Sequence, residues 1–284
     1  MTSHKDSGIQ YCMKIFPLLD DAQVLNGVVD DFPRIIREFS SLGSIETDYS
    51  WDPFTDDTIT PTIIAEWNVL NQKLGKMFVS RSRRLLSIGG GGNTPTINFL
   101  SDSLEYFCVV NPSIRDIEMY KQRSQGDSRI LLIRGIGEMV PFKDGSFDTV
   151  EIPATLDHCI NHEKVLAECF RVLEPGGKLV ITGGNNASWY RQLFSIFKIP
   201  FSDPNEHHHT FDLSPRILRN LLQSHGFKDV STETNYFLKL PKFVERRIDS
   251  PVLLLVHQFL SNRVLPRVFG RSRGGMLLTS AVKT

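Results

Sequence analysis

The chain has 284 residues, of which 40% are hydrophobic and 23% charged, the composition of an ordinary globular protein. Its 32 basic residues balance 32 acidic ones, so no overall positive field would attract nucleic acid, and we expect no nucleic-acid partner. No apolar run approaches the roughly 20 residues of a membrane-spanning helix, and the polar start MTSHKDSG lacks a secretory signal pattern. These features predict a cytoplasmic protein without a transmembrane segment.

Charge is distributed unevenly between the two ends of the chain. Residues 1–60 hold eleven acids and four bases, whereas residues 239–284 hold nine bases against Glu245 and Asp249. Such asymmetry can mark an interaction surface, although the two ends can also simply face each other or water. Because the C-terminal bases surround the apolar run Val252–Leu255, residues 239–273 predict a lid or a peripheral membrane contact.

From residue 84 onwards, short apolar runs alternate with helical patterns. Predicted strands are Arg84–Ile88, Tyr106–Val110, Ile130–Ile133, Phe147–Ile152, Lys178–Thr182, Lys228–Tyr236 and Met276–Val282. Predicted helices cover residues 94–103, 114–123, 162–173 and 214–224, with Pro175-Gly176-Gly177 ending the third. Strands separated by helices indicate an α/β protein with a parallel, doubly wound sheet.

The remaining segments divide the chain. We interpret residues 1–80 as an added N-terminal helical cap and residues 81–284 as the main domain. Residues 238–275 read as an insertion between the last two strands.

Four glycines, Gly89–Gly92, directly follow the first predicted strand. Such a turn lets the backbone approach a ligand, and ligands of open parallel sheets bind beyond the carboxyl ends of the strands. The dinucleotide fingerprint Gly-x-Gly-x-x-Gly fails, because the sixth position is Thr94 or Pro95, and no Gly-Lys-Ser/Thr phosphate loop follows. The turn therefore suits a nucleoside without a pyrophosphate and disfavours a nicotinamide dehydrogenase.

Five segments carry further patterns. They are Arg84-LLSIGGGGNTP, Val109-VNPS, Gly135-IGEMVPFKDGSFD, Leu156-DH followed by Glu168-CFRVLEPGG, and His225-GFKDV. In this order and spacing they resemble the motifs of class I S-adenosylmethionine-dependent methyltransferases, most of all the small-molecule branch. The resemblance covers about residues 80–236. It implies a three-layer Rossmann-like fold with a seven-stranded, mostly parallel sheet, and S-adenosylmethionine as cofactor.

The resemblance also implies a set of cofactor-binding residues: Gly89, Gly90, Gly91, Asn111, Ile136, Gly137 and Pro153. The sequence departs from the family pattern at Ser87, Asn111 and Ile136, where the family usually has acids, and Asn93 replaces the third glycine. A neutral amide accepts ribose hydroxyls less strongly than a carboxylate does. Two functions stay open: methyl transfer to an unidentified small molecule, or a catalytically retired binding or scaffold protein.

Two histidines are candidate general bases for a hydroxyl acceptor. His158 matches the family's histidine after the fourth strand, and His208 lies within His207-His-His209. His158 could instead simply pack at the start of a helix. Three adjacent histidines point in different directions, so we expect no metal site from them.

Aromatic residues suggest what the acceptor is like. Trp189, Tyr190, Phe194, Phe197 and Phe201 follow the fifth predicted strand at spacings that suit core packing or an apolar wall for an aromatic or lipid-like acceptor. Trp51 and Trp67 could close the same mouth. The cysteines, Cys12, Cys108, Cys159 and Cys169, form no Cys-x-x-Cys pair and predict reduced, mostly buried thiols.

Overall fold

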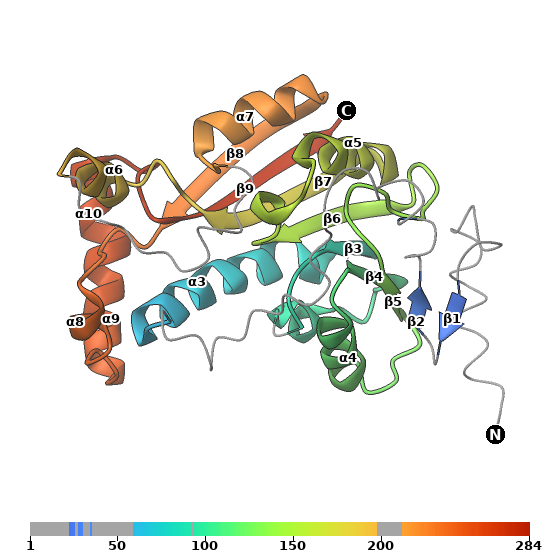
Figure 1. Ribbon diagram of the computed structural model, residues 1–284, viewed down its shortest axis with the longest axis horizontal. Coiled ribbons are helices and arrows are strands. Elements are labelled where there is room, and N and C mark those ends of the chain that lie inside the picture. The colour runs from blue at the N-terminus through green and yellow to red at the C-terminus, as the bar shows by residue number, and fades with distance from the viewer. Residues whose placement is uncertain (1–22, 26–27, 31–34, 36–58, 93, 198–211) are drawn as a thin grey trace.

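The computed structural model describes residues 23–25, 28–30, 35, 59–92, 94–197 and 212–284. They form a nine-stranded sheet in the order β1-β2-β5-β4-β3-β6-β7-β9-β8 (Figure 1). Its strands are β1 (Gln23–Leu25), β2 (Val28–Asp30), β3 (Arg84–Ile88), β4 (Tyr106–Asn111), β5 (Ile130–Arg134), β6 (Phe147–Pro153), β7 (Leu173–Gly184), β8 (Phe227–Asn235) and β9 (Met276–Lys283).

Seven of these strands, β3 to β9, make up the sheet predicted from the sequence. Strands β3 to β7 pair in parallel, and β9 runs antiparallel to both of its neighbours, β7 and β8. The mostly parallel, Rossmann-like sheet expected from the sequence is thus confirmed. The sequence did not predict β1 and β2, which extend the sheet beside β5. Each has three residues, too few for an alternating pattern to reveal a strand.

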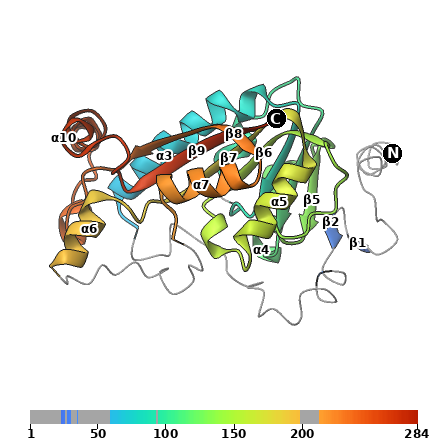
Figure 2. The same cartoon turned by 90° about the horizontal axis from the view of Figure 1, so that it is seen from above.

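Helices cover both faces of the sheet (Figure 2). The face that Leu86 and Ile88 share is covered by α5 (His162–Val172) and α7 (Pro215–Ser224). Leu85 points to the other face and packs with α3 (Pro61–Met77) and α4 (Ile114–Arg123). This alternation follows from the period of two along a strand and produces three layers.

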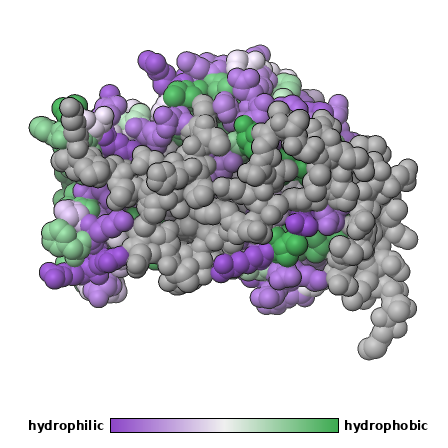
Figure 3. Space-filling view, in the orientation of Figure 1, coloured by the Kyte–Doolittle hydropathy of each residue, from purple (hydrophilic) through white to green (hydrophobic). Residues whose placement is uncertain are grey.

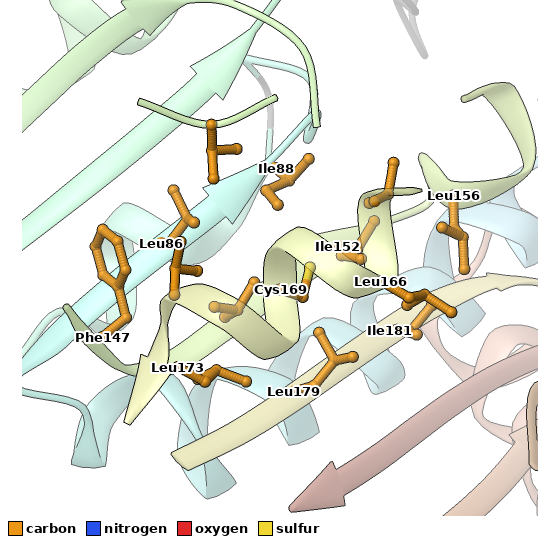
Figure 4. Close-up of a cluster of buried hydrophobic side chains, with 14 of the residues drawn as sticks. Leu86, Ile88, Phe147, Ile152, Leu156, Leu166, Cys169, Leu173, Leu179 and Ile181 are labelled. Carbon is orange, nitrogen blue, oxygen red and sulfur yellow. The ribbon is translucent and has the colours of Figure 1, made fainter. Parts of the chain in front are cut away.

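The larger core lies between the sheet and α5 (Figure 4). Leu166 and Cys169 of α5 lie against Ile152 of β6 and Ile181 of β7, and all four side chains are fully buried. The continuous apolar runs in the sequence reflect this burial, because strands of a parallel sheet are covered on both faces. The core holds the carboxyl ends of β3, β4 and β6 side by side.

Two local predictions were wrong. Residues 94–103 form only a short 3-10 turn, Pro95–Phe99, in which the Thr96 side chain bonds to Glu151 instead of supporting an α-helix. Helix α5 ends at Val172 and passes directly into β7, so Pro175-Gly176-Gly177 lies within the strand. Gly176 has φ +81°, and the pairing with β6 shifts register between Phe147 and Thr149.

The segment between β8 and β9 forms a separate group of short helices. It contains α8 (Lys242–Glu245), α9 (Pro251–Phe259), a π-helical turn (Leu260–Val264) and α10 (Leu265–Phe269). These helices and α6 (Trp189–Ile196) gather at one end of the molecule, at the left of Figure 1. The division into a 1–80 cap and a main domain remains a prediction.

Three cysteines, Cys108, Cys159 and Cys169, are buried and form no disulfide bond with one another, and Cys12 lies outside the described residues. Over the described part of the chain, no cluster of His, Cys, Asp and Glu is arranged to hold a metal ion. None of the helices described here is long and apolar enough to cross a membrane.

Candidate cofactor site

The glycine turn begins where β3 ends and packs tightly against the segment that follows β6. Gly89 adopts φ +83°, and its N–H donates to the Val110 carbonyl at 2.8 Å. A Cβ atom at Gly89 would lie 2.0 Å from Thr155 Cγ2, and one at Gly90 would lie 2.5 Å from Pro153 Cγ. Side chains at these two positions would collide, so glycine is required by the fold itself.

Gly91 differs from its neighbours. A Cβ atom there would meet only Asp116 Oδ1, at 3.8 Å, which is an ordinary contact distance, and the residue is half-buried. The missing side chain therefore leaves space that nothing in the described chain fills. At this point a ligand can approach the backbone closely.

Asn111, at the end of β4, holds the first half of the turn. Its buried side chain donates from Nδ2 to the carbonyls of Gly89 and Gly90, the second at 3.2 Å. Its Oδ1 accepts from the Ser113 N–H at 2.8 Å. Both N–H directions of the amide are thus used on the turn, which a carboxylate at this position could not do.

Helix α4 holds the second half of the turn through two side chains that sequence reasoning missed. Asp116 Oδ1 accepts from the Gly92 N–H at 2.9 Å. Arg123 donates to the carbonyls of Gly92 and Thr94, the latter at 2.6 Å. Their spacing of seven residues places both on one face of the helix, a signal that the sequence contained.

A buried polar cluster lies beneath the turn, on the face covered by α4. Glu151 of β6 is the cross-strand partner of Ser87 on β3, and both are buried. Glu151 Oε1 accepts from the Thr96 hydroxyl at 2.8 Å, whereas Glu151 Oε2, Ser87 Oγ and Tyr120 Oη have no hydrogen-bond partner within the described residues. Ser87 Oγ lies 3.4 Å from where a Gly90 Cβ would be.

Burial dominates the electrostatics of this cluster. It raises the pKa of Glu151 to about 7, although the hydrogen bond from the Thr96 hydroxyl opposes the shift. The pKa of Tyr120 is also raised by burial, and the carboxyl of Glu151 adds to that shift. The sequence signal for Glu151 was a charged residue in the middle of a strand expected to be buried on both faces.

Part of the chain is similar in sequence to known methyltransferases. Residues 86–181 match the family model described as a methyltransferase domain. A demethylmenaquinone methyltransferase of Clavibacter sepedonicus is 30% identical over 120 residues, which are 40% of this chain and 49% of that protein. A ubiquinone/menaquinone biosynthesis C-methyltransferase of Erwinia tasmaniensis is 31% identical over 108 residues, 36% of this chain and 43% of that protein. Both matches span less than half of these relatives.

The fold is also similar to that of a solved methyltransferase structure. A methyltransferase structure from Thermotoga maritima superposes with a TM-score of 0.55 at 17% identity, covering 77% of this chain and 90% of that one. Residues 86–181 therefore match a methyltransferase domain, and the described sheet has the fold of S-adenosylmethionine-dependent methyltransferases. The glycine turn of that domain is the segment described above.

The methyltransferase domain brings most of the expected cofactor-binding residues to one edge of the sheet. Gly89, Gly90, Gly91, Asn111 and Pro153 lie together at the carboxyl ends of β3, β4 and β6. Their predicted contacts with the cofactor remain predictions. Asn93, which stands at the family's third glycine, lies outside the described residues.

Ile136 and Gly137 follow β5 and are buried in packing contacts. Ile136 clusters with Ile35 and the partly buried Met139. A Cβ atom at Gly137 would lie 2.6 Å from Ile88 Cγ2, so this glycine lets the loop after β5 pack against β3. Both residues therefore hold the loop after β5 in place through packing contacts.

The candidate bases occupy different situations. His158 ends a 3-10 turn (Leu156–His158), is half-buried, and donates its backbone N–H to the Thr155 carbonyl at 2.9 Å. Thr155 packs closely against Gly89 of the glycine turn, and His158 follows Thr155 by three residues. His208 and Trp51 lie outside the described residues.

The aromatic residues after β7 pack against the helices that follow β8. Trp189 stacks on Phe269 with 4.2 Å between ring centroids and donates to the Phe237 carbonyl at 2.7 Å. Tyr190 is buried and lies edge-on to Tyr236. For Trp189 and Tyr190, the core-packing interpretation therefore accounts for the ring contacts. Trp67, on α3, is partly buried and packs at the margin of the core.

Proposed function

We propose that this chain transfers the methyl group of S-adenosylmethionine to an apolar, aromatic small molecule. The observation that carries the proposal is the open side of Gly91 in a turn whose neighbouring glycines are closely packed. The turn lies at the carboxyl edge of a parallel sheet, where ligands of such folds bind. The acceptor class is inferred from two relatives, which are named for menaquinone and ubiquinone synthesis.

The residues present suit this cofactor. When bound, S-adenosylmethionine supplies a methyl group already activated on a sulfonium, so the protein mainly orients the reactants and excludes water. In our proposal the Gly91 backbone lies against the cofactor, while Asn111, Asp116 and Arg123 fix the turn that presents it.

The transfer also releases a proton. The acceptor atom forms a bond to the methyl carbon as the carbon–sulfur bond breaks, and the acceptor's proton passes to a base. His158 is our first candidate for that base, because it lies directly after the segment that packs on the turn. His208 is the second.

Calorimetry of the full chain with S-adenosylmethionine and S-adenosylhomocysteine tests the cofactor site. We expect binding in the micromolar range that Gly91→Val weakens more than tenfold, because its branched side chain fills the open space without meeting packed atoms. The matched control is Ser103→Val, which adds a similar side chain at an exposed turn. Normal binding by Gly91→Val would place the site elsewhere.

A second function, a retired binding protein, is favoured by Ser87 and Asn111 standing where the family has acids. The two functions separate in one assay that supplies a short-chain demethylmenaquinol and follows S-adenosylhomocysteine formation. Turnover that Gly91→Val abolishes supports the enzyme. Cofactor binding without turnover, or no binding at millimolar cofactor, supports the retired protein.

A further inference from the structure

Helix α9 exposes apolar side chains and turns polar ones towards the protein. On its outward side, Val252, Leu255, Val256 and Phe259 are 69%, 66%, 51% and 60% exposed. A helix on the surface of a protein in water normally shows the opposite arrangement, with the apolar stripe facing the core. The exposure therefore calls for a covering apolar environment.

The inward side of α9 and the turn after it is polar. His257 bonds to the Leu238 carbonyl at 2.8 Å, and Gln258 donates to the Ala65 carbonyl at 3.1 Å. Ser261 accepts from the Phe237 N–H at 2.8 Å, and Asn262 donates to Glu66 at 2.8 Å. These bonds tie the helix to α3 and to the chain after β8, so its orientation is fixed and the apolar side cannot simply rotate inwards.

Neighbouring helices continue the same surface. Phe243 on α8 and Val268 on α10 are 67% and 69% exposed. We call the six outward side chains of α8, α9 and α10 the apolar patch: Phe243, Val252, Leu255, Val256, Phe259 and Val268. Figure 3 shows hydrophobic and hydrophilic groups interleaved at this end of the molecule, the left of the view.

Among the described residues 239–273, which carry the patch, basic side chains outnumber acidic ones. Five arginines in this segment are exposed: Arg246, Arg247, Arg263, Arg267 and Arg271. Asp249 is an exposed acid there, while Glu245 is fully buried and bonded to Lys239 at 2.9 Å. An apolar surface bordered by arginines complements the acyl chains and negative headgroups of an anionic lipid bilayer.

We infer that α8, α9 and α10 dock this protein onto an anionic membrane surface. The nine residues of α9 are too short to span a bilayer, so the helix lies in the interface with its apolar side towards the acyl chains. The arginines at its borders contact phosphates. This inference does not depend on the acceptor or on methyl transfer.

Co-sedimentation of the full chain with vesicles tests the docking. We expect binding to phosphatidylcholine containing about one third phosphatidylserine, weak binding to phosphatidylcholine alone, and release at high salt. Val256→Ser with Phe259→Ser should lower vesicle binding at least tenfold, and Arg246→Gln with Arg247→Gln should lower it about fivefold per base. Thermal unfolding confirms that the variants remain folded.

Helix α7 supplies matched controls, because Arg216, Ile217 and Arg219 are also exposed. Ile217→Ser and the pair Arg216→Gln with Arg219→Gln should leave vesicle binding unchanged. The inference is overturned if wild-type protein stays in the supernatant with anionic vesicles at low salt. It is also overturned if light scattering shows a dimer that only the patch variants dissociate, since the covering surface is then a second copy of the chain.

Discussion

Glu151→Gln should make the protein more stable at alkaline pH. Glu has an ordinary pKa of 4.5, and burial raises the pKa of Glu151 to about 7 in the folded chain. Between these pH values the folded state keeps a proton that the unfolded state has lost. The free energy of unfolding therefore falls as pH rises from about 4.5 to about 7, and it levels off above that range.

The size of this effect follows from the shift. A difference of two to three pKa units corresponds to about 3 kcal/mol of stability lost by the wild type at pH 8. Gln has the same shape, carries no charge, and can still accept from the Thr96 hydroxyl. We expect the variant to exceed the wild type by about 3 kcal/mol at pH 8, and by less than about 1 kcal/mol near pH 5.

Urea unfolding from pH 5 to pH 8 measures this difference. Glu118→Gln, an exposed carboxylate on α4, controls for the general effect of removing a charge. A stability difference between Glu151→Gln and wild type that stays constant with pH would refute the assigned titration. Equal stability of the two proteins at all pH values would place Glu151 in contact with water.

Two further predictions concern the turn and the C-terminal helices. Asn111→Asp should weaken S-adenosylhomocysteine binding in calorimetry and cost about 2 kcal/mol in urea unfolding, because the side-chain donors to Gly89 and Gly90 are lost. The control Asn161→Asp keeps a helix N-cap and should be neutral. Tighter binding by Asn111→Asp would contradict the role of the Asn111 amide in holding the turn. Glu245→Gln should cost about 3 kcal/mol in urea unfolding, because it leaves Lys239 without its buried counter-charge; a loss below about 1 kcal/mol would show that this ion pair contributes little.

The strands were well predicted because helices cover both faces of the sheet, so each buried strand is a continuous apolar run. Strand β3 and helix α4 have the bounds that their patterns gave, since apolar runs and a Ser N-cap are local signals. The short strands β1 and β2 carry no such signal, and they join the sheet through the pairing of β2 with β5, which is a tertiary contact. The 3-10 turn at Pro95 was missed because the Thr96–Glu151 bond joins residues 55 positions apart.

The site was harder to predict because its residues act on one another. The glycine positions followed from the turn, but no sequence pattern indicated that the amide of Asn111 holds that turn, and its contact with the ribose stays a prediction. Asp116 and Arg123 are ordinary helix-surface residues by type. Only the docking of α4 beside the turn gives them a role.

Ser87 and Glu151 are best understood as a pair rather than as one lost acid and one unexplained acid. They are direct cross-strand neighbours, so an acid at both positions would bury two carboxylates side by side, which is strongly unfavourable. Ser87→Asp should therefore destabilise the protein at pH 8, whereas the same change made together with Glu151→Gln should cost much less. A double-mutant cycle by urea unfolding should give a coupling of about 1–3 kcal/mol. Simple additivity would show that the two positions are independent. Glu151 would then not explain why Ser87 stands where the family has an acid.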